Sequence, residues 1–75
     1  MIGVKDEKLS KAFGKKFKEL REKTGMSTRE FADTAGIAYS QIWRIETGKG
    51  NPTLGTLKAI ATTLDIPLTE LLKGF

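Results

Sequence analysis

Four side chains in the middle of the chain have the clearest potential for recognition chemistry: Tyr39, Ser40, Trp43 and Arg44. An arginine guanidinium can donate two parallel hydrogen bonds to one planar pair of acceptors, and tyrosine and serine hydroxyls both donate and accept. Ile42 and Ile45 stand three residues apart, so on a helix they share the buried face and leave the four other side chains on the remaining faces. The spacing predicts a helix whose exposed side is equipped to contact a polar partner.

A preceding helix and a glycine turn are the elements that must hold this exposed side in place. Over residues 27–35, the apolar Phe31, Ala32 and Ala35 lie on one side of a helix, and Ala32 is small enough for a close helix crossing. Gly36 then suits a turn that needs a left-handed backbone. Two short helices joined in this way form a helix-turn-helix, whose second helix enters the major groove of DNA. The alternative is an ordinary helical hairpin in a small bundle, because the motif is short.

The chain before this motif predicts one long helix. Apolar residues recur every three or four positions over residues 9–24, and Gly25 ends the pattern. Gly14 weakens this helix slightly, because glycine loses backbone entropy in a helix. Ser27 and Glu30 then have the spacing of a capping box at the start of the second helix.

The chain after the motif predicts two more helices. The third helix is expected over residues 39–47, a fourth over residues 54–64, and a short fifth beyond it. The sequence therefore predicts an all-α fold of five helices with no strand. We expect a flexible N-terminal extension over residues 1–8 and a single domain over residues 9–75.

Composition excludes several classes of protein. The 75 residues include no cysteine and no histidine, which removes disulfides, thiolate metal sites and the usual general base. The nine acidic residues are scattered among lysines, and so short a chain has little room for a deep cleft. No apolar run approaches the roughly 20 residues that cross a bilayer, and the N-terminus lacks the apolar core of a signal peptide. We therefore expect no enzyme, no catalytic residue, no metal, no cofactor and no membrane contact, and a place in the cytoplasm.

Positive charge is unevenly distributed along the chain. The formal net charge is +4: residues 1–26 hold eight basic and four acidic side chains, residues 27–47 hold two and three, and residues 48–75 hold three and two. The predicted motif is thus slightly acidic, and attraction to phosphate must come from Lys49, from helix N-termini, from neutral donors and from N-terminal lysines. We expect only modest binding to DNA of arbitrary sequence.

A wider set of short motifs points to one family. The set comprises Phe17-Lys18-Glu19-Leu20-Arg21, Gly25-Met26-Ser27, Glu30-Phe31-Ala32, Gly36-Ile37, Ile42-Trp43-Arg44-Ile45-Glu46, Gly48-Lys49, Asn51-Pro52-Thr53 and Leu57. In this combination the chain resembles the lambda-repressor-like regulators of Cro/C1 type, also called the xenobiotic response element family, over roughly residues 14–72. The resemblance implies a five-helix DNA-binding domain with the helix-turn-helix at helices 2 and 3. Its third helix would enter the major groove, and the start of its second helix would contact the DNA backbone.

The resemblance also implies roles for individual positions. The positions that match base contacts are Ala38, Tyr39, Ser40, Trp43 and Arg44. The positions that match phosphate contacts are Thr28, Thr47, Lys49 and Asn51. Arg21 and Glu46 match a buried structural ion pair. For Arg44, the alternative to base contact is a surface pair with Glu46 or with a phosphate, since most protein contacts to DNA are to the backbone.

Three residues depart from the usual pattern of this family. Thr28 replaces a glutamine, which leaves only a short hydroxyl to reach phosphate. Ala38 replaces a serine or threonine cap of the third helix, and the loss of that cap costs roughly 0.5–2 kcal/mol of helix stability. Trp43 stands where smaller residues are usual, and either contacts thymine methyl groups or packs against Phe17.

Together these features predict a sequence-specific DNA-binding transcriptional regulator, a repressor, that binds a near-palindromic operator as a homodimer. The predicted dimer interface is the apolar C-terminal group Ile66, Leu68, Leu71, Leu72 and Phe75. Ordinary core packing is the alternative for this group. Because the chain ends directly after the fifth predicted helix, we expect no ligand-sensing domain.

The alternative function is that of a protein-binding module, such as an antitoxin or adaptor with the same fold. The slightly acidic charge of the motif favours it. A basic surface on the DNA side around Lys15, Lys16, Lys18 and Lys49, with a steep fall of affinity in salt, would instead favour DNA binding.

Overall fold

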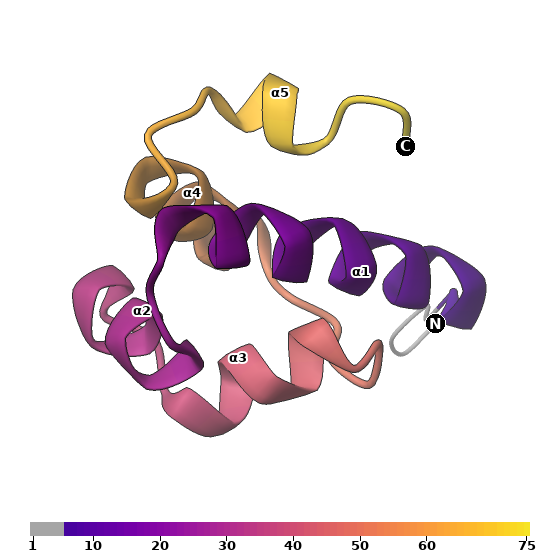
Figure 1. The fold of residues 1–75 in the computed structure, drawn as a ribbon. Coiled ribbons are helices and arrows are strands. Elements are labelled where there is room, and N and C mark those ends of the chain that lie inside the picture. The colour runs from indigo at the N-terminus through magenta and orange to yellow at the C-terminus, as the bar shows by residue number, and fades with distance from the viewer. Residues whose placement is uncertain (1–5) are drawn as a thin grey trace.

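The computed structural model describes residues 6–75, and over this range the chain forms five helices and no strand. The helices are α1 Glu7–Thr24, α2 Thr28–Ala35, α3 Tyr39–Glu46, α4 Leu54–Thr63 and α5 Leu68–Leu71. Figure 1 shows α1 running across the middle of the molecule, with α3 on one side of it and α5 on the other. The predicted all-α architecture is confirmed. Within residues 6–75, no helix combines the length and the apolar character needed to cross a membrane.

The start of α1 differs from the prediction. The Asp6 carboxylate accepts a hydrogen bond from the Leu9 amide at 3.0 Å and caps the helix, which therefore begins at Glu7 rather than Leu9. Glu7 and Lys8, which we assigned to an extension, belong to α1, and residues 1–5 of that extension lie outside the described residues. Both α3 and α4 end one residue earlier than predicted, within the usual spread of helix boundaries.

Large apolar side chains from all five helices meet in one core. The fully buried ones are Phe17, Phe31, Ile42, Ile60 and Leu71. The rings of Phe17 and Phe31 meet edge to face, with centroids 5.2 Å apart. Leu71 is 0% exposed, because α5 must bury its apolar side against the rest of the subunit. The prediction that Leu71 lies at a dimer interface is therefore wrong.

Backbone contact seats the end of α3 on α1. A Cβ atom on Gly14 would lie 2.3 Å from the carbonyl oxygen of Ile45 and 2.9 Å from that of Glu46, so only glycine allows this approach. Just beyond α3, Gly48 has a φ of 76°, and a Cβ there would lie 2.6 Å from Cγ of Lys11. The helical pattern marks Gly14 only as a weak point of α1, and its role in this crossing was not predicted.

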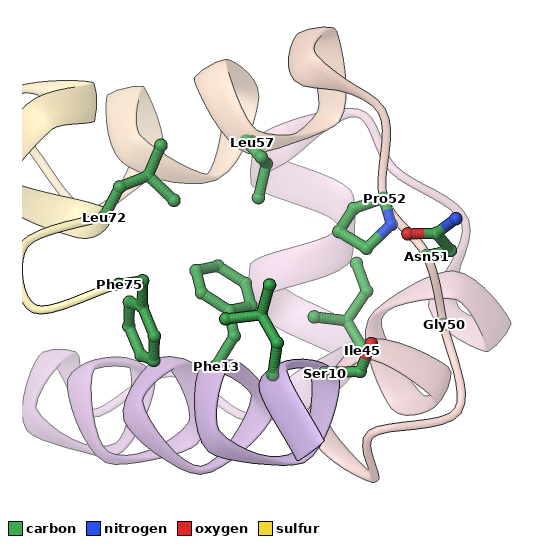
Figure 2. Close-up of a pocket in the computed structure, with 10 residues that line it drawn as sticks. Ser10, Phe13, Ile45, Gly50, Asn51, Pro52, Leu57, Leu72 and Phe75 are labelled. Carbon is green, nitrogen blue, oxygen red and sulfur yellow. The ribbon is translucent and has the colours of Figure 1, made fainter. Parts of the chain in front are cut away.

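A cleft of about 160 Å³ opens between α1, α4 and the C-terminal segment (Figure 2). The apolar side chains of Phe13, Leu57, Leu72 and Phe75 are among those that line it. The rings of Phe13 and Phe75 meet edge to face, with centroids 5.9 Å apart. Leu72 and Phe75, both predicted at a dimer interface, thus make contacts inside their own subunit, although Phe75 remains 49% exposed.

Lys16 attaches the C-terminal segment to α1. Its ammonium group donates to the carbonyl oxygens of Glu70 and Lys73, both at 3.0 Å, and lies 5.4 Å from the centroid of the Phe75 ring. Lys16 is therefore directed toward α5, across α1 from α3 (Figure 1). Lys16 is therefore not part of a basic surface on the DNA side, the feature that would favour DNA binding over the protein-binding alternative.

Candidate nucleic-acid interface

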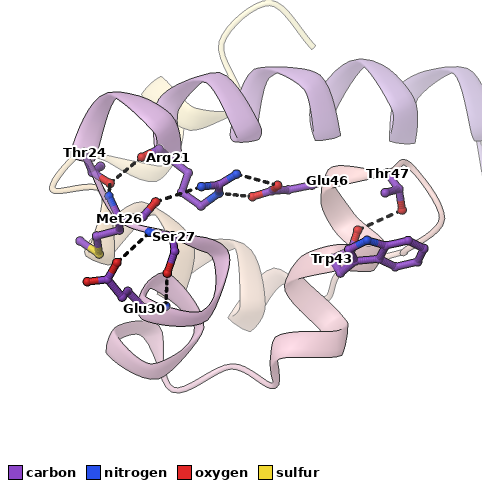
Figure 3. A network of polar contacts seen from close by, with 8 residues as sticks. All are labelled: Arg21, Thr24, Met26, Ser27, Glu30, Trp43, Glu46 and Thr47. Atoms are coloured by element: carbon purple, nitrogen blue, oxygen red, sulfur yellow. Dashed lines mark hydrogen bonds and ion pairs between the residues drawn. The ribbon is translucent and has the colours of Figure 1, made fainter.

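Hydrogen bonds at both ends of α2 fix where α3 begins. The Ser27 hydroxyl accepts from the Glu30 amide at 3.1 Å, and the Glu30 carboxylate accepts from the Ser27 amide at 3.0 Å, which forms the predicted capping box (Figure 3). Hydrogen bonds from the Ser27 amide and hydroxyl lower the pKa of Glu30 below its ordinary value. Gly36 ends α2 with a φ of 72°, as a left-handed turn into α3 requires.

The exposed side of α3 carries the side chains predicted to contact bases. Ile42 and Ile45 are buried. The exposed positions of α3 and its cap are Ala38, Tyr39, Ser40, Gln41, Trp43 and Arg44. Ala38 is the N-cap residue and makes no side-chain cap hydrogen bond. Tyr39 and Trp43 are 42% and 45% exposed, so α3 presents two aromatic rings one helical turn apart.

Each of these rings has a cation over it. The guanidinium carbon of Arg29 lies 4.8 Å from the centroid of the Tyr39 ring, and Nζ of Lys49 lies 5.1 Å from that of Trp43. Trp43 is thus exposed beside Lys49, and the alternative in which it packs against the buried Phe17 is wrong. Arg29 was not among the residues predicted at the interface. Its place on the first turn of the helix before α3 was the signal that could have found it.

Arg44 is attached to the turn that follows α3. Its Nη2 donates to the carbonyl oxygen of Lys49 at 3.3 Å, while the amides of Lys49 and Gly50 donate to the Arg44 carbonyl at 2.8 and 2.9 Å. Glu46 pairs with Arg21, so the alternative of a pair between Arg44 and Glu46 is wrong. A guanidinium has five N–H donors, and this one bond leaves Arg44 able to donate to a base or a phosphate.

The predicted ion pair between Arg21 and Glu46 ties the end of α3 to α1 (Figure 3). Nε and Nη2 of Arg21 donate to the two carboxylate oxygens of Glu46 at 2.5 and 3.1 Å, and Nη1 donates to the Met26 carbonyl at 2.9 Å. The two side chains are only 10% and 7% exposed. The hydrogen bond to Glu46 raises the pKa of Arg21 above its ordinary value, so the guanidinium stays charged.

The residues predicted to contact phosphate differ in whether their side chains already form hydrogen bonds within the chain. Thr28 is the first residue of α2, and Asn51 is exposed in the loop before α4. The Thr47 hydroxyl donates to carbonyl oxygens of α3, that of Trp43 at 2.9 Å or that of Arg44 at 3.2 Å. Because a phosphate oxygen only accepts, Thr47 must rotate away from these carbonyls to contact one.

The residues that build this arrangement match a known family of proteins. A family model described as helix-turn-helix matches residues 17–71, which is most of the chain and includes both α2 and α3. The chain belongs to the Cro/C1-type helix-turn-helix family. The resemblance drawn from the short motifs is thereby confirmed.

Known relatives of this Cro/C1-type chain are regulators. Its structure is similar to that of the restriction-modification controller protein C.AhdI from Aeromonas hydrophila, with a TM-score of 0.80 and 34% identity over 83% of this chain and 94% of that chain. For the master regulator of biofilm formation SinR, solved in complex with DNA, the TM-score is 0.75 with 32% identity over 81% and 98% of the two chains. The transcriptional regulator DdrOP3 of Deinococcus deserti is 34% identical over 59 residues, 79% of this chain and 46% of that protein. The chain spans between 18% and 46% of the length of the first three curated relatives.

Proposed function

We propose that this Cro/C1-type chain binds double-stranded DNA at a specific sequence and regulates transcription, as a repressor that occupies its operator. The observation that carries the proposal is the exposed side of α3, where polar and aromatic side chains lie between the cations of Arg29 and Lys49. A major groove about 12 Å wide admits one α-helix. SinR, which has a similar fold, was solved in complex with DNA.

In the proposed complex, α3 lies in the major groove and the start of α2 meets the DNA backbone. The base contacts come from Ala38, Tyr39, Ser40, Trp43 and Arg44, and the phosphate contacts from Thr28, Thr47, Lys49 and Asn51. We add Arg29 to the phosphate contacts, because its guanidinium lies beside the first residue of α3. Arg44 is the side chain best suited to a bidentate pair with guanine O6 and N7.

We further propose that the regulator acts as a homodimer on a near-palindromic site. Without the buried Leu71, the predicted interface comprises Ile66, Leu68, Leu72 and Phe75. Phe75 and Leu9 line the cleft of Figure 2 and are 49% and 47% exposed, and Leu54, 71% exposed, lies one turn before the cleft-lining Leu57 on α4. A second copy placed over this edge would remove these apolar side chains from water. The same cleft borders Ile45 of α3, so the proposed interface would lie on the side of the subunit where α3 ends.

The proposed role requires neither catalysis nor a cofactor. The chain would act in the compartment that contains its DNA, and we propose that this is the cytoplasm.

Selection from a random library tests the proposal. The purified chain is incubated at near-physiological salt with duplexes that have a randomised centre, and the retained DNA is sequenced. We expect enrichment of an inverted repeat with half-sites about one helical turn apart. If nothing is enriched and binding is weak and lost in salt, the proposal fails and a protein-binding role explains the fold better.

Arg44→Ala in the same selection tests the role of its guanidinium. Loss of one good bidentate pair costs about 1–3 kcal/mol of discrimination at one base pair, so that position of each half-site should lose its preference while the others keep theirs. Gln41→Ala is the matched control on the same helix. An unchanged preference at every position in Arg44→Ala would assign Arg44 to phosphate contact instead.

A further inference from the structure

Tyr39 and Trp43 form an exposed aromatic pair that the general role of a recognition helix leaves unexplained. Large apolar side chains are normally buried, yet these two are 42% and 45% exposed. They are four residues apart, so they lie on the same side of α3, about 6 Å apart along its axis. This side of α3 therefore offers two rings for apolar contact with neighbouring base pairs.

The cations of Arg29 and Lys49 determine which part of each ring is available. Each lies over one face of its ring, with 4.8 Å between the Arg29 guanidinium and the Tyr39 centroid and 5.1 Å between the Lys49 ammonium and the Trp43 centroid. A contact of this kind restricts the rotation of the ring and covers that face. The exposed remainder of each side chain, 42% of Tyr39 and 45% of Trp43, is left for a partner.

An intact duplex offers only one kind of apolar group to such rings. Its bases are stacked on one another, so their faces are inaccessible, and the major groove displays donors, acceptors and the C5-methyl group of thymine. The Tyr39 hydroxyl and the Trp43 Nε1–H can each form one hydrogen bond, but the ring carbons offer no strong partner to the donors and acceptors of a base. The thymine methyl group fits both the apolar character and the exposed position of the pair.

We propose that Tyr39 and Trp43 recognise the C5-methyl groups of thymines in each half-site, with Arg29 and Lys49 as positioning residues that hold the rings. The inference rests on the proposed function, because α3 must enter the major groove. Arg29 comes from α2 and Lys49 from the turn after α3, so the two cations flank the rings at opposite ends of α3. There each cation orients a ring and also lies where a phosphate strand borders the groove.

Replacement of single thymines by deoxyuridine in the enriched duplex tests the inference, because it removes the methyl group alone. We expect the native chain to bind at least one such duplex about fourfold more weakly, as for the loss of one buried methyl group. Trp43→Ala and Tyr39→Ala should bind the unmodified duplex more weakly and lose sensitivity at the position that each ring contacts. Gln41→Ala is the matched control: Gln41 lies on α3 next to Arg44 and Asn51, and this variant should keep the full sensitivity.

The outcomes separate this inference from the proposed function. Specific binding with equal affinity for thymine and deoxyuridine at every position overturns the inference and leaves the proposed function intact. Retained sensitivity in both Tyr39→Ala and Trp43→Ala also overturns it, because another side chain then contacts the methyl groups. If no duplex is enriched, both fall.

Lys49→Gln tests the positioning role. A residue that only neutralises a phosphate would weaken binding equally to the thymine and deoxyuridine duplexes and reduce the dependence of affinity on salt. A residue that holds the Trp43 ring would also reduce the ratio between the two affinities. We expect that ratio to fall from about four toward one. An unchanged ratio would overturn the positioning role of Lys49.

Discussion

The ion pair between Arg21 and Glu46 holds the end of α3 against α1, so the loss of either side chain should destabilise this contact. Glu46→Gln would leave the guanidinium of Arg21, a side chain that is only 10% exposed, charged and with a neutral partner. Removal of one partner of a buried pair costs about 3–5 kcal/mol, and a chain of this size has on the order of 3–5 kcal/mol in total. We expect a large shift of the urea midpoint, or a chain that is mostly unfolded in buffer.

The control for this experiment is Glu19→Gln, an exposed carboxylate on α1. It removes the same charge from the same chain. It should change the free energy of unfolding by no more than about 0.5 kcal/mol, the usual range for surface changes. If Glu46→Gln has the same urea midpoint as the native chain, the ion pair does not stabilise the packing of α3 on α1.

The capping box of α2 makes stability depend on pH through Glu30. Hydrogen bonds from Ser27 lower the pKa of Glu30 in the folded state. A lowered pKa means that the carboxylate contributes stability above its unfolded pKa, and that this contribution is lost as the pH falls through the folded value. Between about pH 7 and about pH 3, the melting temperature of Glu30→Gln should therefore fall by less than that of the native chain. An equal loss in both chains would show that the charge of Glu30 does not stabilise the helix.

At the scale of the elements, the crossing of α1 and α3 depends on the absence of a side chain at Gly14. Alanine there gains about 1 kcal/mol in helix propensity, but its Cβ would lie 2.3 Å from the Ile45 carbonyl oxygen. Overpacking of this kind costs about 1–3 kcal/mol or more, and a backbone oxygen cannot rotate away as a side chain can, so the clash outweighs the gain. We expect Gly14→Ala to lower the free energy of unfolding, measured by urea denaturation.

Gly55 provides the matched control within the same chain. A Cβ on Gly55 would meet nothing closer than Oγ1 of Thr53 at 3.9 Å, an ordinary contact. Gly55→Ala should thus only gain helix propensity. We expect it to be as stable as the native chain or up to about 1 kcal/mol more stable. If Gly14→Ala and Gly55→Ala behaved alike, α1 and α3 would not approach as closely as the structure has them.

The helices could be predicted from the sequence because each depends on local patterns. The apolar series along α1, the capping box of α2 and the turn at Gly36 all lie within a few residues of what they determine. Contacts between distant residues could not be predicted in this way. The tight fit at Gly14, the burial of Leu71 and the bonds from Lys16 to α5 depend on which helices meet.

The same division holds for the candidate interface. The exposed side of α3 was predictable, because Ile42 and Ile45 identify the buried side. The cation over Tyr39 was not, because Arg29 reaches it from another helix. Nor could a sequence pattern show that the Thr47 hydroxyl donates to a carbonyl of its own helix, since this depends on one side-chain rotation.

At the scale of the whole molecule, one copy is too small to recognise a long site. A helix of eight residues is about 12 Å long and reaches only a few base pairs. The longest dimension of the molecule is 37 Å, comparable to the roughly 34–36 Å between half-sites one turn apart. Two copies in contact can therefore span adjacent turns of one face of the duplex, which is the geometry that a near-palindromic operator needs.

The proposed dimer edge can be tested by removing its exposed apolar side chains. Leu54→Ser and Phe75→Ser change side chains that are 71% and 49% exposed, so each subunit should still fold. Sedimentation at tens of micromolar should show a dimer for the native chain and monomers for the double variant, which should also lose the advantage of an inverted repeat over a single half-site. Lys58→Ser, exposed on α4, is the control and should remain dimeric. A native chain that is monomeric both alone and on the enriched duplex would contradict the dimer, because two recognition helices without a shared interface bind half-sites independently.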